Sequence, residues 1–73
     1  MSTNRTDREA VQEIARSATT AHVATHAERA LASGSEGDMR KALVEAATSG
    51  QTAHVVHVAK TQLGYKWNGR NYE

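Results

Sequence analysis

The side chains best suited to chemistry in this sequence are four histidines, which occur as two closely spaced pairs. His22 and His26 lie four residues apart, and His54 and His57 lie three apart. Either spacing places both rings on one side of a helix, where imidazole nitrogens can bind a metal ion. Both pairs, however, lie opposite the apolar face of their predicted helix, and no carboxylate spacing marks the acidic partners that orient metal-bound histidines. We therefore predict no metal site and no cofactor, and interpret the histidines as solvent-exposed or interfacial side chains.

Other residues typical of catalysis are scarce. The chain has no Cys, no glycine-rich phosphate loop and no HExxH zinc motif. Its closely spaced carboxylates, Glu9 with Glu13 and Glu36 with Asp38, fall on a predicted helix surface and in a predicted linker. A chain of 73 residues also leaves little space for a substrate pocket. We expect the protein not to be an enzyme.

The composition limits the class of protein. The net charge is +1, and Leu, Ile, Val and Phe together number only ten, against 13 Ala. Such a thin core requires helices that pack closely through Ala, or a core shared with a second copy. The apolar runs are far shorter than the roughly 20 residues that span a bilayer, and the segment Met1–Arg8 has no apolar signal core. We expect a soluble, cytoplasmic protein that forms a homodimer.

An internal repeat organises most of the chain. With an offset of 32 residues and no gaps, residues 8–31 align with residues 40–63, and 11 of the 24 positions are identical. Seven of these identities are not Ala, namely Arg8/Arg40, Glu13/Glu45, Ser17/Ser49, Thr20/Thr52, His22/His54, Val23/Val55 and Leu31/Leu63. This match predicts a duplicated structural unit.

Each unit is predicted to contain two helices. In the first unit, the apolar side chains of residues 11–18 share one helical face, and those of residues 23–31 share a face on the opposite side of a continuous wheel. One straight helix cannot bury both faces. The second unit shows the same reversal, with Gly50 suited to a helix C-terminus and Thr52 to an N-cap, and Asp38 is the predicted cap of the third helix.

The predicted fold class is therefore a small all-α protein of two duplicated helix-turn-helix hairpins with a short C-terminal β-hairpin. The predicted helices lie near residues 6–17, 20–32, 38–49 and 52–63. A flexible N-terminus at residues 1–5 precedes a single domain at 6–73, divided into a repeat unit at 6–32, a linker at 33–37, a repeat unit at 38–63 and the β-hairpin at 64–73. The alternative is two continuous helices of about 26 residues that dimerise into a four-helix bundle.

The last ten residues contain every Tyr and Trp of the protein. Asn68–Gly69 is typical of a two-residue type I′ turn, which is the basis of the predicted β-hairpin. Strand alternation then places on one face Tyr65, Trp67, Arg70 and Tyr72. We interpret this face as a cover for the end of the helical core, and the alternative is a stacking surface for a nucleic acid or a peptide.

The second repeat unit resembles a helix-turn-helix DNA-binding motif over about 20 residues. Ala46, Gly50 and Val56 stand at the spacings of its small residue, turn glycine and buried aliphatic residue. Glu45 and Ser49 stand where that motif prefers apolar residues. The resemblance implies that the second helix of the unit enters the major groove, and with the following hairpin the region looks like a miniature winged helix.

The charge pattern agrees with a nucleic-acid partner, since no acidic residue occurs between Ala46 and Tyr72. The primary prediction is a small regulatory protein, such as a transcription regulator, that binds DNA as a homodimer. Its predicted DNA contacts are Gln51, His54, His57, Lys60, Thr61, Lys66 and Arg70. The alternative is a small interaction or inhibitor protein of the kind encoded by phages and mobile elements, which binds a host protein. Its predicted contact residues are Tyr65, Trp67, Tyr72, His22 and His26.

Overall fold

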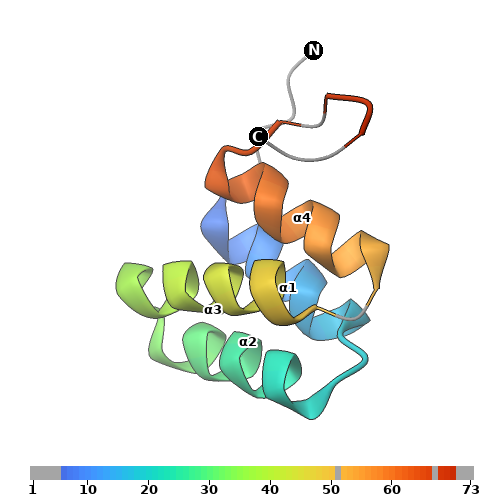
Figure 1. Ribbon diagram of the computed structural model, residues 1–73. Helices are drawn as coiled ribbons and strands as arrows, with labels where there is room; N and C mark the ends of the chain where they lie inside the picture. Colours follow the sequence, from blue (N-terminus) through green and yellow to red (C-terminus); the bar gives the residue numbers. More distant parts are fainter. Residues whose placement is uncertain (1–5, 51, 67, 71–73) are drawn as a thin grey trace.

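The computed structural model describes residues 6–50, 52–66 and 68–70, and within them the chain forms four α-helices and no β-strand (Figure 1). The helices are α1 (Asp7–Ser17), α2 (Ala21–Ser33), α3 (Glu36–Ser49) and α4 (Ala53–Leu63). The prediction of four helices is confirmed. The alternative of two continuous helices is wrong, since residues 18–20 leave the helical conformation between α1 and α2.

The equivalent helices of the two repeat units occupy equivalent places in the fold. Helices α1 and α3 contact each other, and each packs against both α2 and α4, whereas α2 and α4 make no contact in the described part of the chain. In Figure 1, α3 lies between α2 and α4, with α1 behind it. The first helices of the two units thus form the centre of the fold, and the second helices flank them.

The core consists of small and branched aliphatic side chains on the inner faces of the helices. Its buried members are Ala10, Val11, Ile14, Val23, Ala27, Ala30, Met39, Ala42, Leu43, Ala46, Val55, Val58 and Ala59. Five pairs related by the offset of 32 residues account for most of them: Ala10/Ala42, Val11/Leu43, Ile14/Ala46, Val23/Val55 and Ala27/Ala59. Ala side chains let helices approach closely, so these few large side chains fill the space between them.

Hydroxyl side chains determine where three of the helices begin. Thr6 forms a capping box with Glu9, in which the Thr6 hydroxyl accepts the Glu9 N–H at 3.1 Å and the Glu9 carboxylate accepts the Thr6 N–H at 3.0 Å. Thr52 caps α4 as predicted. Ser35, not Asp38, caps α3, which therefore begins two residues earlier than predicted. Asp38 instead lies in the first turn, where its carboxylate favours the helix N-terminus.

Gly50 ends α3 for a reason of space. Its φ of −64° is open to any residue, so the left-handed conformation typical of a terminal glycine is not what requires it. A Cβ at Gly50, however, would overlap the carbonyl oxygen of Ala46 and lie 2.9 Å from Cγ2 of Val56. The chain can therefore turn this closely into α4 only where a side chain is absent.

The predicted C-terminal β-hairpin is not seen: the described residues 64–66 and 68–70 contain no strand. Gly69 takes the left-handed conformation, with φ 97°, as a turn glycine does. The Asn68 carboxamide oxygen accepts the Arg70 N–H at 2.9 Å, a side-chain turn that substitutes for the backbone turn. Trp67 and Tyr72 lie outside the described residues.

Candidate binding groove and histidine cluster

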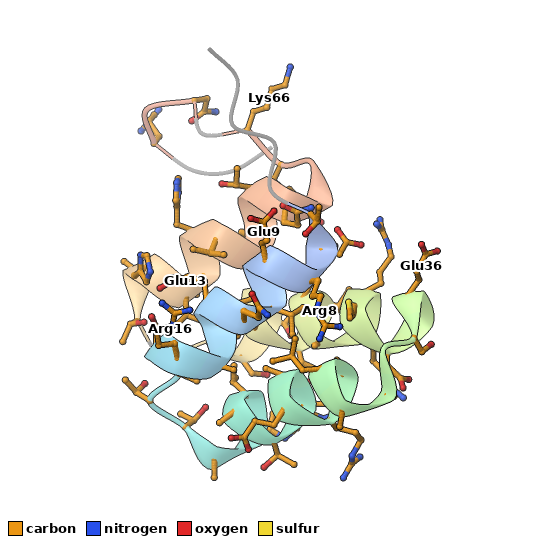
Figure 2. All side chains as sticks on the ribbon, turned by 180° about the vertical axis from the view of Figure 1, so that it is seen from behind. Arg8, Glu9, Glu13, Arg16, Glu36 and Lys66 are labelled. Carbon is orange, nitrogen blue, oxygen red and sulfur yellow. The ribbon has the colours of Figure 1, made fainter. Side chains whose placement is uncertain are left out.

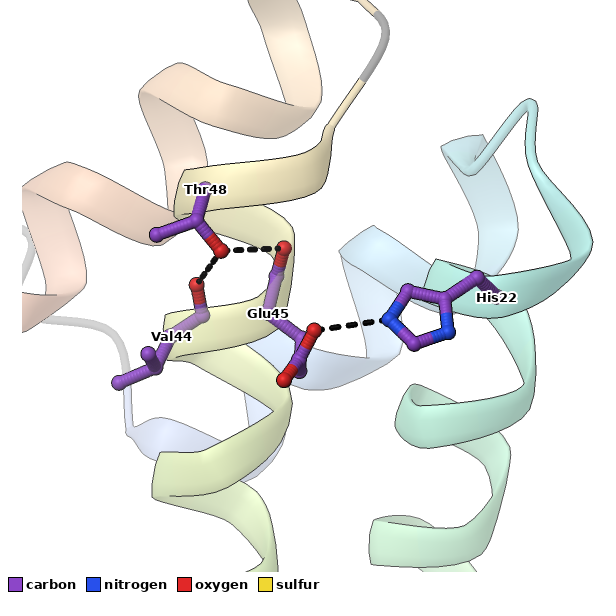
Figure 3. A network of polar contacts seen from close by, with 4 residues as sticks. All are labelled: His22, Val44, Glu45 and Thr48. Atoms are coloured by element: carbon purple, nitrogen blue, oxygen red, sulfur yellow. Dashed lines mark hydrogen bonds and ion pairs between the residues drawn. The ribbon is translucent and has the colours of Figure 1, made fainter.

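Two reciprocal His–Glu contacts join the repeat units. Nε2 of His22 in α2 lies 2.8 Å from Oε2 of Glu45 in α3 (Figure 3), and Nε2 of His54 in α4 lies 3.0 Å from Oε2 of Glu13 in α1. The offset of 32 residues converts the first pair into the second, with the units exchanged. Such an exchange is typical of the interface of a two-fold symmetric dimer, here built within one chain.

Both carboxylates are held in their charged form. The hydrogen bond from His54 lowers the pKa of Glu13 below its ordinary value, and a second hydrogen bond, from the Ser17 hydroxyl at 2.8 Å, lowers it further. The hydrogen bond from His22 likewise lowers the pKa of Glu45. Because an ionised carboxylate only accepts hydrogen bonds, Nε2 is the protonated, donating nitrogen in both imidazoles.

A third side chain joins only one of these pairs. The ring of His26 is half-buried and packs edge-on against the ring of His22, with 4.7 Å between the ring centroids. Ligand atoms of His22, His26 and Glu45 all lie within 4.8 Å of one another. The second unit has buried Val58 at the position equivalent to His26. The two units therefore share a His–Glu contact but differ in the side chain beside it.

A groove lies between α3 and the end of α4, on a different side of α3 from Glu45. Its lining residues are Arg40, Val44, Ala47, Thr48, Lys60, Leu63, Gly64 and Tyr65. Val44 and Tyr65 are 45% and 46% exposed, and they are the large apolar side chains left exposed in the described part of the chain. The groove thus combines apolar side chains with a cation on each helix, Arg40 on α3 and Lys60 on α4.

The backbone at the end of α4 positions Tyr65 in this groove. Gly64 takes the left-handed conformation, with φ 103°, and the Tyr65 N–H donates to the Lys60 carbonyl at 2.9 Å. Together with the bond from the Gly64 N–H to the Thr61 carbonyl, this is a Schellman motif. It turns the chain back toward α3 and brings the Tyr65 ring to the same groove as Val44.

The residues predicted to contact DNA differ in exposure and in the contacts that they make within the protein. His57 and Thr61 are exposed on α4, and Lys66 and Arg70 are exposed after it, with Lys66 directed away from the helices (Figure 2). Lys60 lines the groove. His54 is held by Glu13, so it is not available to reach a base without breaking that contact. Gln51 lies outside the described residues.

Carboxylates border α4 on the side of α1. Beside the His54–Glu13 contact, the side-chain amide of Gln62 donates to Oδ1 of Asp7 at 2.7 Å. Figure 2 shows Glu9 and Glu13 on the exposed side of α1. Of the basic side chains, Lys60 on α4 and Arg40 on α3 therefore lie at the groove, and Lys66 and Arg70 are exposed after α4.

Sequence reasoning found Tyr65, His22 and His26 but missed their partners. Glu45 contacts His22, and both belong to the identities of the repeat, so paired conservation within the duplication is the signal that was available. Val44 is not among these identities, and although Arg40 is, nothing in the sequence shows which side of α3 remains uncovered.

No helix among the described residues is long and apolar enough to cross a membrane. Comparisons of the chain with models of known protein families, with curated protein sequences and with solved structures find no match.

Proposed function

We propose that this is a small, non-enzymatic interaction protein whose groove between α3 and α4 binds a short segment of another protein, one with apolar side chains flanked by carboxylates. The observation that carries the proposal is the exposure of Val44 and Tyr65 along one groove. Exposed large apolar side chains that meet in a concave surface are typical of protein interaction sites.

The charges around the groove select an acidic partner. Arg40 on α3 and Lys60 on α4 contribute to its lining, and no carboxylate occurs among the described lining residues. Carboxylates on the bound segment would accept hydrogen bonds from these cations while its apolar side chains cover Val44 and Tyr65. A groove of this size suits a short segment and a transient complex.

DNA binding is the second candidate, and the absence of acidic residues between Ala46 and Tyr72 favours it. Arg40 and Lys41 would add to the predicted phosphate contacts Lys66 and Arg70. The carboxylates of Asp7 and Glu13 beside α4, however, would repel phosphates on either side of a groove-bound helix. We therefore rank the acidic protein segment first.

Selection from a phage-displayed peptide library tests the first candidate. We expect the selected peptides to carry Leu, Ile or Phe next to Asp or Glu, and fluorescence polarisation to measure their dissociation constants. Val44→Glu should weaken binding about tenfold or more, since it replaces an apolar side chain of the groove with a carboxylate that repels the carboxylates of the peptide. Arg40→Ala should weaken binding and reduce its dependence on salt. Arg29→Ala, which removes the same charge from the exposed face of α2, is the matched control and should leave binding unchanged.

Two other results would contradict the proposal. Binding to duplex DNA at 50 mM salt that is lost in Lys60→Ala and Lys66→Ala, without acidic peptides in the selection, would favour the DNA candidate. A dimer in sedimentation that Val44→Glu dissociates would assign the groove to a second copy of the chain.

A further inference from the structure

We propose that His22, His26 and Glu45 form a binding site for one divalent transition-metal ion, with Zn²⁺ as the best fit. The site is separate from the groove and joins α2 of the first repeat unit to α3 of the second. It supplies two imidazole nitrogens and one carboxylate, a ligand set that zinc takes with water in the remaining position.

The ligand atoms of His22, His26 and Glu45 are already close together without an ion. One imidazole nitrogen of each histidine and one carboxylate oxygen lie within 4.8 Å of one another. His22 and His26 are one helical turn apart on α2, so the backbone presents both rings to the same point. Glu45 already reaches that point, since its Oε2 lies 2.8 Å from Nε2 of His22 (Figure 3). For Nε2 of His22 to bind the ion, the proton of this contact must move to Nδ1 or be released to solvent.

The duplicated structure provides an internal comparison. The second unit repeats the His–Glu contact with His54 and Glu13 but has Val58 in place of His26. His57, the other histidine of α4, stands at the position equivalent to Thr25. The His54–Glu13 contact offers two ligands, whereas the cluster of His22, His26 and Glu45 offers three. We therefore expect one metal ion per chain, bound at the cluster.

The charges near the cluster have opposite effects on cation binding. Glu45 is an ordinary ionised carboxylate at neutral pH, and its negative charge favours the ion. The ammonium group of Lys41 also acts on Glu45 and opposes a second positive charge. Lys41→Ala should therefore tighten metal binding.

Isothermal titration of untagged, metal-free protein with ZnCl₂ at pH 7.5 tests the site, and Co²⁺ absorption reports the coordination. We expect one ion per chain. His26→Val copies the residue of the second unit and should weaken binding about tenfold or more. His54→Ala and His57→Ala are the matched controls and should bind zinc as the unchanged protein does. Circular dichroism of each variant checks that it folds.

Histidine ring ¹⁵N spectra of the unchanged protein give a measurement that needs no variant. Stoichiometric Zn²⁺ should shift the signals of His22 and His26 and leave those of His54 and His57 in place. Absence of zinc binding, binding unaffected by His26→Val, or equal shifts of all four histidines would overturn the proposal. None of these results depends on the groove, so the proposed function is tested separately.

Discussion

At the scale of single residues, the His–Glu contacts show how two exposed positions acquire a structural role. A histidine on a helix face opposite the apolar residues is usually solvated, and His22 and His54 are indeed 56% exposed. Each nevertheless reaches a carboxylate of the other repeat unit. The contacts therefore act between units, and they contribute to how the two halves are oriented.

The Glu13–His54 contact predicts a pH dependence of stability. Because the pKa of Glu13 is lowered in the folded protein, the contact stabilises the fold above the ordinary value of 4.5, and this contribution is lost as the pH falls through the lower, folded value. The groups that face Glu13 are His54, Ser17 and Arg16. Urea unfolding should show that Glu13→Gln destabilises the protein at pH 7 and destabilises it less as the pH falls below 4.5. An equal effect at pH 7 and at the lower pH would contradict this assignment.

At the scale of elements, the helix boundaries follow from local chemistry and the hairpin does not. Between α1 and α2 and between α3 and α4, the helices end and begin where local signals in the sequence predict. These signals are the reversal of the apolar face, the threonines at residues 20 and 52, and Gly50. Asn68–Gly69 is also a local signal, but a short hairpin needs packing against other elements to form. The Asn68 side chain satisfies the turn by itself, and Tyr65 packs near α3 instead.

The contacts between elements were harder to predict. Glu45 lies 23 residues from His22 along the chain, so their contact depends on how α2 and α3 pack. The groove depends on the end of α4, where the Schellman motif turns Tyr65 toward Val44. Periodicity shows which face of a helix is apolar, but it does not show which apolar side chain lacks a neighbour.

The equivalent threonines at the starts of α2 and α4 give a prediction about capping. The Thr52 hydroxyl accepts the Val55 N–H at 3.4 Å, whereas Thr20 makes no side-chain cap bond. Thr52→Ala should therefore lower the free energy of unfolding by about 1 kcal/mol, and Thr20→Ala by less. Chemical denaturation of both variants measures the difference. Equal losses would show that the hydroxyl bond is not the source of the effect.

The two glycines of α3 and its end should respond in opposite directions to alanine. Gly50→Ala places a Cβ against the Ala46 carbonyl and Val56, so we expect a loss of roughly 1–3 kcal/mol. At Gly37, in the first turn of α3, a Cβ would meet only the Ser35 hydroxyl at 3.7 Å. Gly37→Ala should stabilise the protein by about 0.5–1 kcal/mol. Thermal unfolding of the pair tests whether space, rather than glycine as such, matters at residue 50.

For the whole molecule, the duplication allows two units with few large apolar side chains to form one shared core. Ten large aliphatic side chains are few for a domain, but the equivalent helices α1 and α3 meet at the centre and share them between the two units. Of the ten, Val44 is the one left exposed. The other nine are buried or half-buried within one chain, and Val44 lies in the groove that we propose as the binding surface.

The oligomeric state follows from the same reasoning. Sedimentation velocity at micromolar concentration should give a single species with the mass of the chain, 7.9 kDa. The composition predicts a homodimer, because the core is thin and could be shared with a second copy. In the structure, the two repeat units of one chain form this core together. A concentration-dependent dimer would contradict the expected monomer, and its sensitivity to Val44→Glu would show whether the groove forms the interface.

We propose that the groove between α3 and α4 binds an acidic peptide segment. Titration of the ¹⁵N-labelled protein with a selected acidic peptide, followed by ¹H–¹⁵N spectra, tests this binding. We predict that the shifted backbone signals belong to Arg40, Val44, Thr48, Lys60, Leu63 and Tyr65, and that Val44→Glu abolishes the shifts. Signals that shift on the exposed faces of α1 and α2, and remain in Val44→Glu, would contradict the assignment of this groove as the binding surface.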